Sequence, residues 1–369
     1  MPTEYTSASA GAVITGVGAQ LPACHGANGL WRAAMKPGSY AVTPASWSKP
    51  DLLETVIDEA LVDAGFIARP RRPVLNVMVV VCAQADARQS TLPPFLHGAD
   101  ADVLATCAGP APVTVLSHAC ATGGFAIRMA VQLLAARQTD VVVVAGASVS
   151  DPMEEMSLEA VGVLAKGVVR PLDTGRDGMA VGRGAIALVL ERPDNAAARG
   201  RTRTVGVANA ACLVKPSRAE SDPAAVSSVL RTVLCPADGA EPKRVDAVCS
   251  HATGTVLGDE VEFGELALLG KEFGWNDVPV FSNKGAIGHL LHTSALASVA
   301  HAAEAMRRSV VPSTAGCASP MAADPAVHVS TESSPASLEH VLVNAFGFGG
   351  NYASVLLQKN MLERRLRDE

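Results

Sequence analysis

The sequence predicts an α/β protein made of two similarly organised halves. Short apolar runs alternate along the chain with segments whose apolar residues recur at helical spacing, a pattern typical of sheets covered by helices. Of the 369 residues, 49% are hydrophobic but only 4% are aromatic. Aliphatic side chains must therefore fill the core, as in buried, largely parallel sheets. We place the two halves at residues 1–195 and 196–369.

Strand and helix patterns follow one another in the same way in both halves. In the first half, strands are predicted at residues 12–16, 74–82, 140–146 and 184–190, and helices at residues 52–64 and 125–136. A linker rich in Arg and Ala is predicted at residues 195–204. In the second half, strands are predicted at residues 204–214, 245–250, 278–281, 340–344 and 353–357, and helices at residues 223–234, 259–269 and 295–307.

Composition excludes several classes of protein. The formal net charge is −6 and no long basic run occurs, which argues against a nucleic-acid partner. Apolar windows such as residues 141–147 are too short to span a membrane, and residues 1–11 do not resemble a secretory signal. Eight cysteines occur without Cys-x-x-Cys spacing, so neither a zinc site nor a disulfide framework is expected. We therefore expect a soluble cytoplasmic protein without a metal.

A candidate nucleophile, Cys120, lies in the segment SHACATGG at residues 117–124. This segment leads directly into a predicted helix, and the positive end of a helix dipole stabilises a thiolate. A thiolate is a strong nucleophile, so the segment favours covalent chemistry. The alternative is that Cys120 is a small buried hydrophobic residue, as most free cysteines are. The segment alone leaves both interpretations open.

Two clusters in the second half follow predicted strands. The segment beginning at His251 reads HATGT and leads into a helix whose first turn carries Asp259 and Glu262. The segment at residues 282–289 reads SNKGAIGH and carries Lys284 and His289. Each has an ordinary alternative, a satisfied histidine or a surface lysine.

A third cluster, NAFGFGGN at residues 344–351, lies between two predicted strands and is rich in glycine. Its ordinary alternative is a simple turn. Functional groups in α/β proteins gather at the carboxyl ends of strands. The joint occurrence of the three clusters with Cys120 therefore favours an active site with a nucleophile, two imidazoles and a cation.

These motifs, in this order, resemble those of the β-ketoacyl synthases, the condensing enzymes of fatty-acid and polyketide assembly. The segment RPLDTGRDG at residues 170–178 is also similar to a family signature, and the resemblance runs from the first strand nearly to the C-terminus. It implies the thiolase-like fold, with two pseudo-duplicated halves in an α-β-α-β-α arrangement of layers.

The resemblance implies a role for each motif residue. Cys120 would accept the acyl group, His251 and His289 would be the two active-site histidines, and Lys284 would support His289 and the electrostatics of the site. The backbone N–H groups of Cys120 and Phe348 would form the oxyanion hole, and Phe348 would be the gate beside the acyl pocket.

The implied reaction is a decarboxylative Claisen condensation of a Cys-bound acyl group with a malonyl-type thioester. No cofactor is expected, because the substrates are carried on the phosphopantetheine of an acyl carrier protein or on CoA. Thr253 and Thr255 would hydrogen-bond this arm. The expected partners are an acyl carrier protein and a second subunit, in a homodimer or in a heterodimer with a related ketosynthase-like chain.

Two further functions remain open. The acyl group could pass to an amine or alcohol without decarboxylation, or the chain could be a non-catalytic partner subunit of a ketosynthase heterodimer. The retained Cys120, His251, Lys284 and His289 argue against the second. A thiolase would need a second catalytic cysteine near the glycine-rich loop. The sequence has no cysteine there, which argues against a thiolase.

The sequence departs from the elongating-synthase pattern at several places and suggests a specialised member from secondary metabolism. Residues 31–51 and 83–113 are shorter than expected, and Arg183 stands where Glu is usual. Asn351-Tyr352 replaces the usual Thr-Asn, and residues 294–298 lack the usual glycines. His118, beside the nucleophile, is expected to be structural.

Overall fold

The computed structural model describes residues 11–22, 24–38, 47–66, 76–83, 111–149, 152–202, 204–216, 221–235 and 241–359. The two shortened regions expected at residues 31–51 and 83–113 lie partly outside these residues. The first two residues of the strand predicted at 74–82 lie outside them as well. Within the described part of the chain, no helix is long and apolar enough to cross a membrane.

Twelve strands of the described residues form one mixed sheet with two similarly ordered parts. In the first part the order is β4-β3-β5-β6-β1, and in the second it is β11-β9-β8-β13-β14-β7. The strands of the first part are β1 (Ala12–Leu21), β3 (Val77–Cys82), β4 (Val113–Leu116), β5 (Val141–Ser148) and β6 (Gly184–Glu191). The strands of the second part are β7 (Val205–Val214), β8 (Ala247–Cys249), β9 (Val278–Phe281), β11 (Val327–Val329), β13 (His340–Gly347) and β14 (Asn351–Lys359). The short β2 (Cys24–His25) pairs with β1.

The strand directions repeat between the two parts, which confirms the pseudo-duplicated arrangement. In the first part, β4, β3 and β5 run parallel, while β6 is antiparallel to both β5 and β1. In the second part, β9, β8 and β13 run parallel, while β14 is antiparallel to both β13 and β7. The two parts meet where β1 pairs with β7 over the three residues from Ala12 to Ile14. The division at residue 195 stays a prediction.

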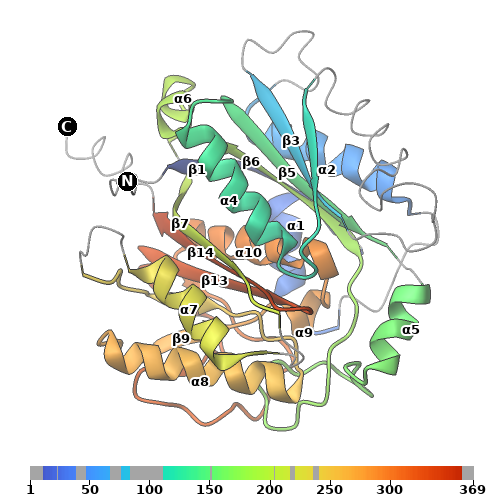
Figure 1. Cartoon of the computed structure of the whole chain (residues 1–369), viewed down its shortest axis with the longest axis vertical. Helices are drawn as coiled ribbons and strands as arrows, with labels where there is room; N and C mark the ends of the chain where they lie inside the picture. The colour runs from blue at the N-terminus through green and yellow to red at the C-terminus, as the bar shows by residue number, and fades with distance from the viewer. Residues whose placement is uncertain are drawn as a thin grey trace.

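Helices cover both outer faces of the sheet parts and fill the space between them, as Figure 1 shows. Helix α2 (Lys49–Asp63) packs on the outer face of the first part. Helices α7 (Pro223–Leu234) and α8 (Val256–Glu272) cover the outer face of the second. Helices α4 (Thr122–Ala135) and α10 (Ser294–Arg308) lie between them. The predicted five layers are therefore confirmed.

The two central helices fit between the sheet parts because their side chains are small. Every residue of α10 from Ser294 to Met306 is buried, and alanine is the commonest residue there. On α4, a Cβ atom added at Gly124 would lie 2.4 Å from the Cβ atom of Ala353 in β14. Glycine is therefore required where α4 crosses the second sheet part.

Several elements differ from the predictions. Helix α6 (Pro193–Ala198) occupies the start of the predicted linker, and α1 (Gly26–Ala34) and α5 (Pro152–Ala160) were not predicted because neither has a long apolar repeat. Helices α4 and α8 begin three residues earlier than predicted. Their first turns contain glycines that tertiary packing tolerates. Strands β13 and β14 extend into the glycine-rich segment and leave a turn at residues 348–350.

The short elements complete the second part of the chain. They are α9 (Lys284–Ile287), the 3₁₀ helix η2 (Leu291–Thr293), and the strand pair β10 (Val310–Val311) and β12 (Ser334–Pro335).

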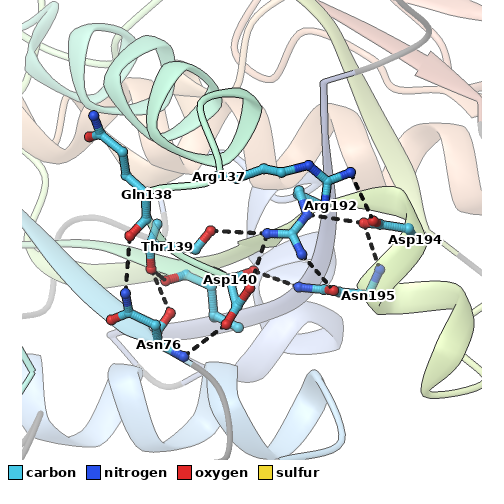
Figure 2. Close-up of polar contacts among 9 residues, drawn as sticks. Asn76, Arg137, Gln138, Thr139, Asp140, Arg192, Asp194 and Asn195 are labelled. Atoms are coloured by element: carbon cyan, nitrogen blue, oxygen red, sulfur yellow. Dashed lines mark hydrogen bonds and ion pairs between the residues drawn. The ribbon is translucent and has the colours of Figure 1, made fainter.

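A polar network fastens the end of α4 to the starts of β3, β5 and α6 (Figure 2). Arg192 donates to the Asp140 carboxylate at 3.0 Å and to the Thr139 carbonyl at 3.2 Å. The backbone N–H of Asn76 donates to the same carboxylate at 3.0 Å, and this bond is the main cause of the lowered pKa of Asp140. The network therefore fixes the positions of the N-terminal ends of β3 and β5 relative to each other.

Gly124→Ala is expected to destabilise the fold by about 1–3 kcal/mol, because the added methyl group meets a Cβ atom that cannot rotate away. The change would be measured as a lower midpoint of urea unfolding. The control is Gly264→Ala on the exposed face of α8, where nothing lies within 4 Å of the added Cβ. At Gly264 we expect the free energy of unfolding to rise by about 0.5–1 kcal/mol, because alanine has a higher helix propensity than glycine. Equal effects at the two sites would contradict the packing argument.

His301 is a buried imidazole in the middle layer. Its ring lies 5.5 Å from the ring of Trp31 and 5.6 Å from that of Phe281. Neither ring nitrogen has a hydrogen-bond partner among the described residues. Burial, reinforced by the charge of Lys284, lowers the pKa of His301 to about 3.

His301→Leu is therefore expected to stabilise the protein more in acid than in base. The folded-state pKa lies below the unfolded value of about 6.5, so the stabilisation that wild type owes to neutral His301 is lost as the pH falls from about 6.5 toward 3. The advantage of the variant should be greater at pH 5 than at pH 8 by about 2 kcal/mol. Urea unfolding at the two pH values tests this, and an equal advantage at both would contradict it.

Candidate active site

Six of the seven predicted site residues line one small cavity. Its volume is about 30 Å³, room for about one water molecule. The predicted residues that line it are Cys120, His251, His289, Phe348, Thr253 and Thr255. The remaining lining residues are Met179, Ser221, Gly258, Asp259, Phe346 and Gly347. Lys284 does not line the cavity but lies buried behind it.

The nucleophile segment forms a sharp turn directly before α4. Ala119 adopts a left-handed conformation with φ 47°. The Thr122 hydroxyl accepts from the His118 N–H at 2.8 Å and donates to the Ala119 carbonyl at 2.6 Å. These contacts close the turn and present Cys120 to the cavity. A Cβ atom at Gly347 would lie only 2.9 Å from the Cys120 nitrogen, so glycine lets the end of β13 approach the nucleophile.

The Cys120 thiol is protonated at rest. Burial raises its pKa to about 12; the negative charge of Glu154 also raises it, while the charge of Lys284 lowers it. The stabilisation that the start of α4 offers a thiolate is therefore opposed by desolvation of the buried sulfur. A proton acceptor must take part when Cys120 attacks.

The two histidines can serve as that acceptor because both are neutral at neutral pH. Their rings lie edge to face, with centroids 5.4 Å apart. Burial, with the charge of Lys284 as the next cause, lowers the pKa of His251 well below its ordinary value and that of His289 to about 3. A neutral imidazole has one N–H donor and one lone pair, so each ring can accept a proton or donate a hydrogen bond.

Two serines on α10 position the groups behind the cavity. The Ser294 hydroxyl lies 2.9 Å from Nδ1 of His289. Lys284 donates from Nζ to the Ser298 hydroxyl at 3.1 Å and to the Ser250 carbonyl at 3.3 Å. Burial lowers the pKa of Lys284. Neither serine was predicted as a site residue; the available signal was their spacing of one helical turn.

Two buried carboxylates hold the loop that carries His251. Glu262 accepts from the backbone N–H of His251 at 2.8 Å and of Ala252 at 2.9 Å, and from the Asn344 amide at 2.9 Å. Asp259 accepts from the backbone N–H of Thr253 at 2.9 Å.

The same Asp259 carboxylate reaches further along the chain. It accepts from Gly254 at 3.1 Å and from Leu172 at 2.8 Å, and burial raises its pKa to about 7. The segment at residues 170–178 is thereby tied to the site. The Thr253 hydroxyl also donates to that of Thr255 at 3.3 Å.

Arg183, which replaces the usual Glu, pairs with Glu155 of α5. The arginine side chain is nearly buried, and Gly182 beside it donates to the His289 carbonyl at 2.9 Å. The substitution therefore connects α5 to the loop that carries His289.

The described residues include no group of three or more His, Cys, Asp or Glu side chains placed to hold a metal ion.

Two models of one family match the chain. The β-ketoacyl synthase N-terminal domain matches residues 103–196, and the β-ketoacyl synthase C-terminal domain matches residues 205–318. Together the matches span more than half of the 369 residues. The chain therefore belongs to the β-ketoacyl synthase family, the family of condensing enzymes.

Similar proteins come from several polyketide and related systems. The chain is 30% identical over 269 residues to the putative polyketide beta-ketoacyl synthase 1 of Streptomyces cyaneus, covering 70% of this chain and 63% of that protein. It is 32% identical over 255 residues to nodulation protein E of Rhizobium leguminosarum bv. trifolii, covering 66% of this chain and 60% of that protein. The hybrid PKS-NRPS synthetase TAS1 of Botryobasidium botryosum is 31% identical over 212 residues, which cover 54% of this chain and 12% of that protein. The chain thus spans less than two thirds of each relative.

Solved structures with the same fold are ketosynthases. The ketosynthase from module 6 of the bacillaene synthase of Bacillus subtilis 168 has a TM-score of 0.81 at 19% identity, covering 95% of this chain and 72% of that one. A ketosynthase in complex with a type II PKS acyl-carrier protein has a TM-score of 0.79 at 17% identity, covering 95% and 99%. These likenesses establish the thiolase-like ketosynthase fold for this chain.

Glu262→Gln is expected to destabilise the protein by about 1–3 kcal/mol, because an NH₂ group would face one of three buried N–H donors that now share the carboxylate. Urea unfolding measures the change. The control is Glu260→Gln on the same helix, where the side chain is 69% exposed and an effect within about 0.5 kcal/mol is expected. Unchanged stability of Glu262→Gln would show that these bonds do not hold the loop.

Proposed function

We propose that the chain catalyses the decarboxylative Claisen condensation of a Cys120-bound acyl group with a malonyl-type thioester, in polyketide or fatty-acid assembly. The observation that carries the proposal is a single cavity shared by one thiol and two neutral imidazoles. The family membership supports the same reaction.

In the first half-reaction, the Cys120 sulfur attacks the carbonyl carbon of an acyl thioester. One of the two neutral imidazoles accepts the thiol proton and later returns it to the departing carrier thiolate, so that protons balance. The backbone N–H groups of Cys120 and Phe348 would hold the oxyanion, each typically worth about 10²–10³ in rate. The product is an acyl thioester on Cys120.

In the second half-reaction, the malonyl thioester loses CO₂, and the electrons of the broken C–C bond form an enolate. N–H donors of neutral His251 and His289 are suited to hold the enolate oxygen. The enolate carbon then attacks the acyl carbonyl, a C–C bond forms, and the C–S bond to Cys120 breaks. The leaving thiolate takes up one proton from solvent, which balances the step. Buried Lys284 contributes by lowering the pKa of both imidazoles, which keeps them neutral.

The substrates would arrive on a phosphopantetheine arm without any further cofactor. The hydroxyls of Thr253 and Thr255 line the cavity and can bind the amides of such an arm. The cavity is small, about 30 Å³, so part of its lining would have to move to admit an acyl chain, and we propose that the gate is the side chain of Phe348.

The acyl carrier protein and a second ketosynthase-like subunit are the partners we propose. In support, one structural relative is a ketosynthase in complex with an acyl-carrier protein, and another is a ketosynthase/chain length factor.

Cys120→Ala is expected to abolish formation of the acyl-enzyme, because the nucleophile is lost. Intact-protein mass spectrometry after incubation with acyl and malonyl carrier-protein thioesters measures it. Wild type and the control Cys235→Ala, a half-buried thiol outside the cavity, should gain the acyl mass. Malonyl carrier should then discharge it with release of CO₂.

Other outcomes would replace the proposal. An adduct that malonyl carrier does not discharge would indicate transfer to an amine or alcohol. Acylation of the Cys120→Ala variant would contradict the role of Cys120. The absence of any adduct on wild type would indicate a partner subunit.

A further inference from the structure

We propose that Asn351 is a positioning residue that ties the turn carrying Phe348 to the segment carrying Cys120, and so keeps the two oxyanion-binding N–H groups aligned. The inference rests on the proposed function for its catalytic consequence, but the tie itself is a property of the structure. Neither the motif resemblance nor the family matches assign a role to this side chain.

The Asn351 side chain bridges the two segments directly. Its Nδ2 donates to the Phe348 carbonyl at 3.0 Å, and its Oδ1 lies 3.1 Å from Nδ1 of His118. His118 is two residues before Cys120. The His118 ring stacks on Phe125 of α4, with centroids 3.8 Å apart and planes at 8°. The anchor on the nucleophile side is therefore a packed ring.

Hydrogen-bond chemistry permits only one orientation of the bridge. The Phe348 carbonyl can only accept, so the NH₂ group of Asn351 must face it. The Asn351 oxygen therefore faces His118, and Nδ1 of His118 must carry a proton. Neutral and protonated imidazole can both satisfy this, so the bridge does not depend on the charge of His118.

The tie acts on the part of the turn formed by Phe348 and Gly349. Gly349 and Gly350 have φ values of 79° and 83°, and glycine leaves the backbone free to change conformation. A Cβ atom built at Gly349 would meet one described atom within 4 Å, Nδ2 of Asn351. The Phe348 side chain is 39% exposed. The two ends of the turn are held elsewhere: Gly347 packs against Cys120, and the Gly350 carbonyl accepts from the Lys215 N–H at 2.8 Å. The Asn351 amide adds a bond to the Phe348 carbonyl between these two ends.

The bridge is specific to the residue found here. The threonine usual at this position in the family has a single hydroxyl oxygen on a shorter side chain. A hydroxyl can both donate and accept, but only from that one oxygen, whereas the amide presents its donor and its acceptor on two separate atoms. Asn351, which stands where threonine is usual, thus positions the Phe348 carbonyl relative to the Cys120 segment. His118 takes part by hydrogen-bonding the Asn351 oxygen.

The test compares Asn351→Asp with wild type. Aspartate keeps the size and the acceptor for His118, but it sets a carboxylate oxygen against the Phe348 carbonyl. Acylation of Cys120 by an acyl carrier-protein thioester should slow about 10- to 100-fold, and the fall should appear in kcat with little change in KM. Alkylation of Cys120 by iodoacetamide needs no oxyanion hole and should keep its wild-type rate. The control Asn209→Asp, on β7 away from the cavity, should leave both rates unchanged.

A double-mutant cycle separates the bridge from general damage. His118→Phe retains the stacked ring but loses the Nδ1 donor, and Asn351→Ala removes the amide. If the bridge is one unit, the double variant should be acylated no more slowly than the slower single variant. Additive losses, a wild-type acylation rate in Asn351→Asp, or an alkylation rate that falls in step with acylation would overturn the proposal.

Hydrogen exchange tests the tie independently of activity. Amide exchange in the peptide containing residues 347–350 should be faster in Asn351→Asp than in wild type. Unchanged exchange would overturn the inference even if wild type proves inactive alone. Absence of acylation in wild type with faster exchange in the variant would count against the proposed function only.

Discussion

The close packing of α4 and α10 between the two sheet parts is the constraint on which the rest of the structure depends. Both helices begin near the site: Cys120 lies two residues before the start of α4, and His289 lies five residues before the start of α10. Small side chains allow this contact, as at Gly124 and along the buried alanine-rich face of α10. Because the starts of the two helices pack against each other at Gly123 and Ala295, the thiol and the imidazole that precede them are brought together.

Burial in this layered core also sets the chemistry. Desolvation keeps the thiol protonated and both imidazoles neutral, and Lys284 enforces the neutral imidazoles from behind the cavity. The lysine is held by the neutral oxygens of Ser250 and Ser298, so its charge acts on the site through space. A site of this kind moves protons between neutral groups and develops charge only as the reaction proceeds.

Much of the fold could be predicted because apolar periodicity is a local signal. The ranges of α7 and β9 match the predictions residue for residue, and the strand order confirms the repeated halves. The short helices α1 and α5 were missed because neither has a long apolar repeat. The extension of β13 and β14 into the glycine-rich segment was missed because glycine is unfavourable in strands. The hydrogen bonds that extend these strands are made with neighbouring strands, so the local sequence does not predict them.

The sequence by itself determined the family, the nucleophile, the two histidines and the lysine as candidates, because these residues stand in ordered motifs at strand and helix ends. Only the tertiary structure decided their state and support. The protonated thiol follows from burial, and the loop of His251 depends on Glu262. Ser298 and the Asn351 bridge depend on residues brought together from distant parts of the chain. Hydrogen-bond partners and desolvation are properties of the packed molecule, and no local pattern records them.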